Sequence, residues 1–115
     1  MVKIPRVIRA YIAGYVDGEG CIRWDRCTPE VRVESCNPFP ARLVSNYFGG
    51  EVKKVNRKTK VTNRSVYRLS YYGENAIALL RSILEFLIEK KKQASGLITM
   101  WEANKVISVE RHKSH

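Results

Sequence analysis

Hydrophobic and polar side chains follow two different periods in the first third of the chain. Apolar residues recur at every third or fourth position between residues 7 and 17, which predicts a helix, and a second face of that helix carries mainly small side chains. Apolar and polar residues then alternate over residues 21–27 and 30–36, which predicts two strands separated by a turn at Thr28-Pro29. The resulting hairpin has one apolar face and one charged face.

A second helix and a second hairpin follow in the same order. The prolines after Asn37 end the strand, and Asn37 is placed to cap a helix over residues 41–48 that ends at two glycines. The later predicted elements are a hairpin formed by residues 51–57 and 65–72 with a cationic tip at 58–64, a third helix that begins at residues 73–75, and a fourth helix that follows a break at 90–93 and extends to about residue 109.

This order predicts an α+β fold in which a four-stranded antiparallel sheet carries its helices on one face. The other sheet face is then uncovered and charged, and such a saddle fits the major groove of DNA, which admits a two-stranded ribbon. The 115 residues are expected to form one domain, residues 1–115. No apolar segment approaches the roughly 20 residues that a membrane span requires, so no membrane partner is expected.

The net charge of +10 is the compositional feature that adds most to this picture, because it indicates a polyanionic partner. Between residues 21 and 72 there are eleven Lys or Arg and four Asp or Glu, so the excess charge is concentrated in the strands. This location favours nucleic acid over an ordinary solvated basic surface. Cys21, Cys27 and Cys36 match no zinc-binding spacing, and they are interpreted as reduced, mostly buried residues of an intracellular protein.

The end of the first predicted helix carries candidate chemistry. Glu19 stands there between two glycines, where the helix dipole is negative and a cation would stabilise the carboxylate. Gly18 suits the left-handed position that ends a helix, and Gly20 leaves room for a close approach to the backbone. Glu19 is therefore a candidate metal ligand; the alternative is an ordinary exposed acid at a helix end.

The segment Ile12-Ala-Gly-Tyr-Val-Asp-Gly-Glu-Gly20 resembles the nine-residue motif that names the LAGLIDADG homing endonucleases, with differences at Tyr15 and Gly18. The predicted element order is similar to the αββαββα core of that family. The resemblance implies a site-specific double-strand DNA endonuclease that cuts across the minor groove, leaves short 3′ overhangs and uses Mg²⁺ or Mn²⁺, with Ca²⁺ as a non-cleaving substitute.

The chain carries one copy of the motif, and in this it resembles the homodimeric members of the family. It implies a homodimer that binds a long pseudo-palindromic DNA site and is encoded within an intron or intein. The expected location is intracellular, in the cytoplasm or nucleoid of a prokaryote or phage-infected cell, or in an organelle.

The resemblance also implies roles for individual residues. Glu19 and the main-chain carbonyl of Gly18 are expected to bind the metal, and Glu19, Asn37 and Lys90 to act in catalysis. Asn37 as a simple helix cap, and Lys90 as part of a solvated lysine run, stay open as alternatives. The predicted dimer interface consists of Ala10, Ala13, Gly14 and Asp17, unless a later helix of the same chain fills that face.

Outward-facing strand residues are expected to contact bases, because Arg pairs with guanine and carboxylates accept hydrogen bonds from cytosine. For Asp25 and Glu34 the alternative is pairing with neighbouring arginines across strands. The predicted DNA-binding residues are Arg23, Asp25, Arg32, Glu34, Lys53, Arg57, Arg64 and Arg68.

Two other functions stay open at this level. One is an RNA maturase that binds intron RNA and aids splicing, and the other is a non-catalytic DNA-binding regulator on the same fold. The intact Glu19 favours the nuclease over the regulator, which would be expected to have lost this acid.

Overall fold

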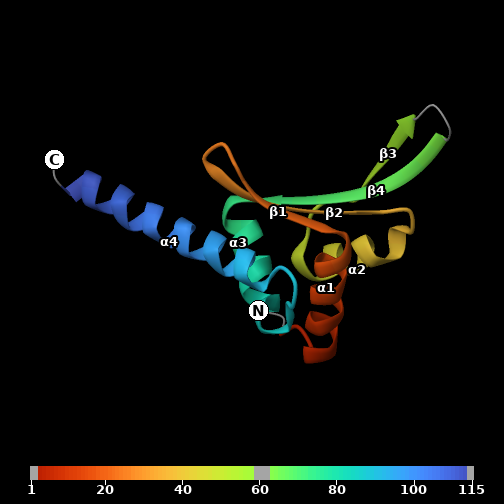
Figure 1. Ribbon diagram of the computed structural model, residues 1–115, viewed down its shortest axis with the longest axis horizontal. Coiled ribbons are helices and arrows are strands. Elements are labelled where there is room, and N and C mark those ends of the chain that lie inside the picture. Colours follow the sequence, from red (N-terminus) through yellow and green to blue (C-terminus); the bar gives the residue numbers. More distant parts are fainter. Residues whose placement is uncertain (1–2, 59–62, 114–115) are drawn as a thin grey trace.

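Four antiparallel strands form one sheet in the order β1-β2-β4-β3, and helices pack against one face of it (Figure 1). The computed structural model describes residues 3–58 and 63–113, without the side chains of residues 57, 58, 63, 64 and 108–113. The elements are α1 (Arg6–Glu19), β1 (Gly20–Asp25), β2 (Thr28–Ser35), α2 (Pro38–Phe48), β3 (Lys53–Lys58), β4 (Asn63–Tyr72), α3 (Gly73–Ile83), a short 3₁₀ helix η1 (Leu84–Phe86) and α4 (Lys91–Lys113). The predicted α+β architecture is confirmed.

Alternating apolar residues of the strands meet the apolar faces of α1, α2 and α3 to form the core. Val31 and Val33 of β2 and Leu69 of β4 are at most 2% exposed, and the strand residues between them face the other way. The buried residues of these three helices are Ile12, Ala13, Tyr15, Val16, Ala41, Val44, Ala76, Ile77, Leu79, Leu80 and Ile83. Burial of one face only leaves the opposite face free for charged residues.

The first turn lies two residues earlier than predicted. Asp25 pairs with Thr28, so residues 26–27 form the turn, and Arg26 adopts a positive φ of 59°. Pro29 is a residue of β2 and does not break it. The pairing of β2 with β4 begins one residue later, so the missing N–H of Pro29 is tolerated.

The first two helices are longer than predicted. α1 continues to Glu19, so Gly18 is a helical residue and does not take the predicted left-handed conformation. α2 begins at Pro38 because the Oδ1 atom of Asn37 accepts a hydrogen bond from the N–H of Phe39 at 3.0 Å. Pro38 itself has no N–H that needs a partner at this position. The capping alternative for Asn37 is therefore confirmed.

The three cysteines are exposed free thiols, and the prediction that they are mostly buried is wrong. Cys21 alternates with buried Ile22 and so lies on the uncovered sheet face. Cys27 belongs to the first turn, and Cys36 follows the end of β2.

The C-terminal helix α4 extends away from the body of the molecule (Figure 1). Its first turns pack against the core through Ala94, Leu97 and Ile98. Val106 and Ile107, farther along, are 58% and 49% exposed. The helix continues to Lys113, beyond its predicted end near residue 109.

Gly20 is required where β1 begins directly after α1. A Cβ at this position would lie 2.5 Å from the carbonyl oxygen of Val16, whereas a Cβ at Gly96 in α4 would meet nothing within 4 Å. We therefore expect Gly20→Ala to lower the free energy of unfolding by about 1–3 kcal/mol. The control Gly96→Ala should raise it by about 0.5–1 kcal/mol. Denaturant titration measures both values, and wild-type stability in Gly20→Ala would contradict this close contact.

Candidate nucleic-acid interface

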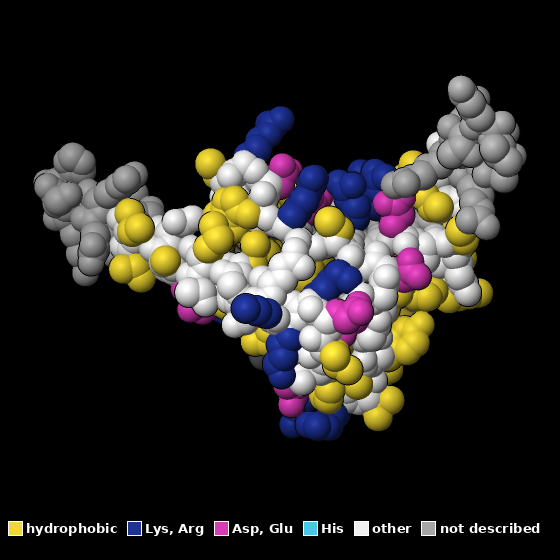
Figure 2. All heavy atoms as spheres, viewed as in Figure 1, with side chains coloured by type: hydrophobic (Ala, Val, Ile, Leu, Met, Phe, Trp, Pro, Cys, Tyr) yellow, Lys and Arg dark blue, Asp and Glu magenta, His cyan; other side chains and the backbone are white. Residues whose placement is uncertain are grey.

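The sheet face opposite the core is charged, and no helix of the described residues covers it (Figure 1). The strand registers align its residues in rows, so that Lys53, Arg68 and Glu34 lie side by side across three strands. Lys and Arg side chains gather along this side of the molecule in Figure 2. The predicted DNA-binding residues whose side chains are described all lie on this face: Arg23, Asp25, Arg32, Glu34, Lys53 and Arg68.

Two more of the predicted DNA-binding residues, Arg57 and Arg64, have their backbones paired with each other near the end of the second hairpin. Their side chains, and the hairpin tip at residues 59–62, lie outside the described residues. Contact of this part with DNA therefore stays a prediction.

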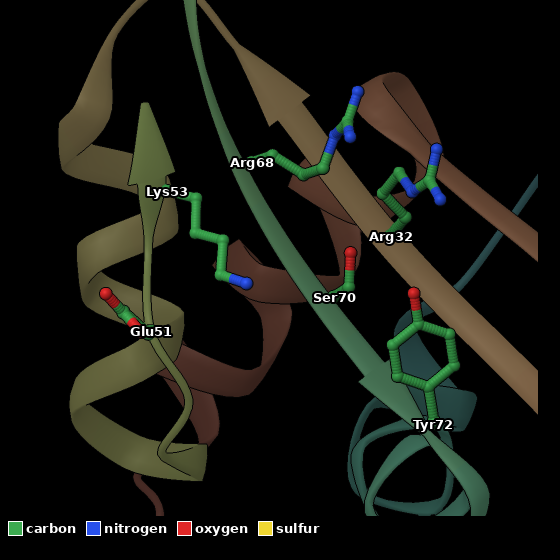
Figure 3. Close-up of a pocket in the computed structure, with 6 residues that line it drawn as sticks. All are labelled: Arg32, Glu51, Lys53, Arg68, Ser70 and Tyr72. Atoms are coloured by element: carbon green, nitrogen blue, oxygen red, sulfur yellow. The ribbon is translucent and has the colours of Figure 1, made fainter. Parts of the chain in front are cut away.

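A hollow of about 370 Å³ opens on this face, between β2, β4 and the start of β3 (Figure 3). Three of its side chains are cationic and come from three different strands. A phosphate or a base edge that enters the hollow would therefore meet several hydrogen-bond donors. The lining residues are Arg32, Glu51, Lys53, Arg68, Ser70 and Tyr72.

Glu34 and Arg68 pair across β2 and β4. The Nε atom of Arg68 lies 3.4 Å from Oε2 of Glu34, and its Nη2 atom lies 3.5 Å from Oε1. This confirms the alternative interpretation of Glu34 as a partner of a neighbouring arginine. The bonds are long, so the pair contributes little stability and a DNA base is able to compete for Arg68.

Glu30 is not among the predicted site residues, yet it is only 1% exposed on this face. Arg23 donates a hydrogen bond through Nε to Oε1 of Glu30, and Arg32 donates through Nη2 to Oε2 at 3.0 Å. Burial raises the pKa of Glu30, but hydrogen bonds from Arg23 and Tyr72 and the charges of both arginines outweigh it, so the pKa lies below its ordinary value. Glu30 is therefore an ionised carboxylate shared by two guanidinium groups. The sequence did carry a signal for this cluster, because the alternation in β2 places Glu30 and Arg32 on the same face of the sheet.

Glu19 lies at the end of α1, where it lines an open hollow of about 480 Å³. Glu34 lines the same hollow and also contacts Arg68, so the hollow borders the basic face. Two carboxylates in an open hollow are hard oxygen donors of the kind that Mg²⁺ prefers. Among the described residues, no cluster of three or more His, Cys, Asp or Glu is placed to hold a metal ion. A metal at Glu19 would therefore need further oxygen donors from the backbone, the substrate or a second copy.

Asn37 follows the part of β2 that lines this hollow, although it is not itself a lining residue. Ser35 connects this segment to α1, because its Oγ atom lies 2.8 Å from the hydroxyl of Tyr15 and donates to the carbonyl of Asn37 at 2.9 Å. Burial raises the pKa of Tyr15; the Ser35 hydrogen bond opposes this effect and the charge of Glu19 adds to it. The Oδ1 atom of Asn37 is used in the helix cap, and its catalytic role stays a prediction.

Lys90 contacts the same end of α1 through Asp17. Its ammonium group donates a hydrogen bond to the carbonyl of Asp17, and its N–H donates to Oδ1 of Asp17 at 3.0 Å. Lys90 is partly buried, whereas Lys91 and Lys92 are exposed. The alternative of a solvated lysine run therefore fits Lys91 and Lys92 but not Lys90. Lys90 is thus bonded to Asp17, which precedes Glu19 by two residues. The catalytic role of Lys90 stays a prediction.

Asp17 joins α1 to the segment before α4, with a further hydrogen bond of 2.7 Å from the N–H of Ile88. Burial raises the pKa of Asp17, but the hydrogen bonds from Ile88 and Lys90 and the charge of Lys90 outweigh it, so the pKa lies below the ordinary 3.8. A carboxyl group with a depressed pKa stabilises the folded state above its unfolded pKa, and this stabilisation is lost as the pH falls through the folded value.

We therefore expect Asp17→Asn to unfold with a free energy about 1–2 kcal/mol below wild type at neutral pH. The difference should shrink as the pH falls below 3.8 and through the lower folded pKa. Denaturant titrations over a pH series measure it. A difference that is the same at acid and neutral pH would contradict this role for the carboxylate.

The structure corrects the predicted dimer interface at two residues. Ala13 is fully buried in the core formed by this chain, and both carboxylate oxygens of Asp17 are bonded to the segment before α4. Ala13 and Asp17 therefore do not form the predicted free face, which the later part of the same chain covers. Ala10 and Gly14 are exposed, and a Cβ at Gly14 would meet nothing within 4 Å.

The exposed face of α1 also includes Val7, which is 78% exposed, and Tyr11, which is 49% exposed. These residues follow one another at helical spacing and so share one side of the helix. We refer to this surface as the α1 stripe, which consists of Val7, Ala10, Tyr11 and Gly14.

No family model and no curated protein matches this chain. It is similar to the solved structure of the homing endonuclease I-CvuI in complex with its target in the presence of Ca, with a TM-score of 0.61 and 23% identity over 84% of this chain and 66% of that chain. It is also similar to the group I intron-encoded homing endonuclease I-CeuI complexed with DNA, with a TM-score of 0.61 and 15% identity over 96% of this chain and 61% of that chain. The archaeal intron-encoded homing endonuclease I-Vdi141I complexed with DNA gives a TM-score of 0.54 and 20% identity over 82% and 66% of the two chains.

The chain thus spans slightly less than two thirds of the length of these three proteins. At such low identities the similarity shows the fold, which is that of the LAGLIDADG homing endonucleases. The resemblance seen in the sequence motif is confirmed at this level. Within the described residues, no helix has the length and apolar character needed to cross a bilayer.

Proposed function

We propose that this chain, which has the fold of the LAGLIDADG homing endonucleases, is a homodimeric, divalent-metal-dependent nuclease that cuts a specific site in double-stranded DNA. The observation that carries the proposal is the position of Glu19. It is an exposed carboxylate at the end of α1, in an open hollow that borders a basic sheet face. A carboxylate that would serve as a metal ligand therefore lies next to a surface that is suited to bind a polyanion, which supports the proposal.

The basic sheet face supplies the DNA-binding surface. β4 contains ten residues, which at about 3.3 Å per residue span about 33 Å, or roughly ten base pairs of duplex. One chain would thus read about half of a long pseudo-palindromic site, with Arg23, Arg32 and Arg68 available to base edges. The complexes of I-CvuI and I-CeuI with DNA support the same partner here.

Glu19 and the main-chain carbonyl of Gly18 are the groups that would hold a divalent metal. Both are oxygen donors at a helix C-terminus, where the last carbonyl groups lack partners within the helix. Mg²⁺ keeps several waters and takes few protein ligands, so this small donor set together with a DNA phosphate suits Mg²⁺ or Mn²⁺, with Ca²⁺ as a non-cleaving substitute. When bound, the metal would activate water and stabilise the leaving oxygen of the broken bond. Lys90 would add positive charge for the phosphate, and Asn37 would orient water.

A second copy of the chain would complete the site. In a twofold dimer the α1 stripe packs against itself, because an isologous interface uses the same surface twice. Each Glu19 ends the helix that carries this stripe, so the two carboxylates would approach the dimer axis together. Like charges so placed repel one another unless a cation neutralises them. One carboxylate per strand would then give a double-strand cut across the minor groove with short 3′ overhangs.

Incubation of a randomised duplex library with the protein and Mg²⁺ tests this function. We expect double-strand cuts within one pseudo-palindromic sequence, and none when the metal is chelated. Sequence-specific binding without cleavage in Mg²⁺ or Mn²⁺ would instead support a DNA-binding regulator. Tight binding of structured intron RNA with no duplex cleavage would support a maturase.

A further inference from the structure

A buried carboxylate lies on the very face that is proposed to contact DNA. Glu30 is 1% exposed, and a buried charge is costly unless it is paired and hydrogen-bonded. Its partners come from three strands: Arg23 on β1, Arg32 on β2 and Tyr72 on β4. The registers place Glu30 directly between Arg23 and Tyr72, so strand pairing itself assembles the cluster.

The carboxylate holds each arginine by a single nitrogen. Arg23 bonds through Nε to one oxygen and its side chain stays 50% exposed, while Arg32 bonds through Nη2 to the other oxygen and stays 30% exposed. In the part of the chain that the structure describes, the terminal nitrogens of Arg23 make no other hydrogen bond. A guanidinium group has five N–H donors in a planar fork. Anchoring at Nε therefore fixes the plane of Arg23 and leaves its two terminal nitrogens for a bidentate contact with guanine.

The charge balance of this cluster also affects DNA binding. Two arginines alone would add two positive charges to the face, and Glu30 cancels one of them. General attraction for DNA grows with the number of phosphates that cations neutralise, whereas discrimination depends on hydrogen bonds to base edges. Glu30 reduces the positive charge and orients the arginine donors. It therefore weakens the general attraction to phosphates and favours hydrogen bonds to base edges.

We infer that Glu30 is a positioning residue for sequence readout, which holds Arg23 and Arg32 in a fixed orientation and suppresses their non-specific attraction for DNA. This inference rests on the proposed function, because it assigns a role within the same DNA-binding face. Glu30 itself acts through the two arginines.

Binding in Ca²⁺ to a randomised duplex library, followed by titrations at several salt concentrations, tests this role. In Glu30→Gln we expect tighter binding of an unselected mixed-sequence duplex and a log–log salt slope steeper by about one. Discrimination at one base pair of each half-site should fall by about tenfold or more. The control Glu102→Gln makes the same charge change at an exposed pair with Arg81, and it should alter neither discrimination nor the salt slope.

Arg23→Lys provides a second variant. It replaces an exposed side chain and no buried group, so the fold should stay intact. Lysine keeps the charge but loses the planar fork, so we expect an unchanged salt slope and the loss of discrimination at the same base pair. In the double variant with Glu30→Gln, this loss should not increase further.

Three results would overturn the inference, and they differ in what they say of the proposed function. If wild type selects a sequence but Glu30→Gln weakens selected and mixed duplexes by the same factor, with an unchanged salt slope, Glu30 has only a structural role and the proposed function stands. The same holds if Arg23→Lys retains full discrimination. If wild type selects no duplex sequence at all, both the inference and the proposed function are overturned.

Discussion

Glu19→Gln is expected to reduce duplex cleavage by more than about a hundredfold while DNA binding stays within a few-fold of wild type. Glutamine keeps the shape of the side chain but loses the charge that would hold a divalent cation. Loss of an outer partner of a metal ligand already costs roughly 10–100-fold in activity or metal affinity, so loss of a direct ligand should cost more. Glu19 is exposed, and the substitution should leave the fold intact.

Cleavage rates in Mg²⁺ and duplex affinity in Ca²⁺ separate these two effects. Glu102→Gln again serves as the matched control, since it removes an exposed carboxylate on α4 that pairs with Arg81 at 2.7 Å. Glu19→Gln that cuts at the rate of this control would show that Glu19 is an ordinary acid at a helix end.

Gly14→Leu is expected to weaken the dimer by about thirtyfold or more and to abolish cleavage at the same protein concentration. A Cβ at Gly14 would meet nothing within 4 Å in one subunit, so the leucine should not disturb the monomer. In a twofold dimer it would enter a contact between helices that pack closely on small residues. Overpacking costs about 1–3 kcal/mol per site, and the symmetry of the interface doubles it to about 2–6 kcal/mol.

Gly96→Leu is the matched control for this substitution. Gly96 is also a helical glycine with open space around it, but it lies on α4. Sedimentation equilibrium measures dimerisation of both variants, and thermal melting checks that both are folded. Equal dimerisation and equal cleavage in the two variants would show that the α1 stripe is not the dimer contact.

The sequence predicted the elements well where a local period decides them. Alternation places Val31 and Val33 in the core and Arg32 and Glu34 on the charged face, and the structure confirms all four positions. The predicted position of the first turn was wrong. The prediction relied on Pro29, whereas the turn forms at Arg26, whose positive φ no residue type in this segment indicates.

The candidate site was harder to predict because its contacts join residues far apart in the chain. Small residues on α1 look alike in the sequence whether they pack within the subunit, as Ala13 does, or stay exposed, as Gly14 does. The bonds of Asp17 with Ile88 and Lys90 span more than seventy residues, and no local pattern encodes them. Glu30 was visible as an outward residue, but its burial depends on arginines from two strands.

The central claim is that two identical chains deliver one Glu19 each to the same duplex. The mass of the protein–DNA complex, measured by light scattering in Ca²⁺ on the selected duplex, tests this claim most directly. We expect two chains per duplex at the concentration where wild type cuts both strands. One chain per duplex in Ca²⁺, at a concentration where the same protein cuts both strands in Mg²⁺, would contradict it.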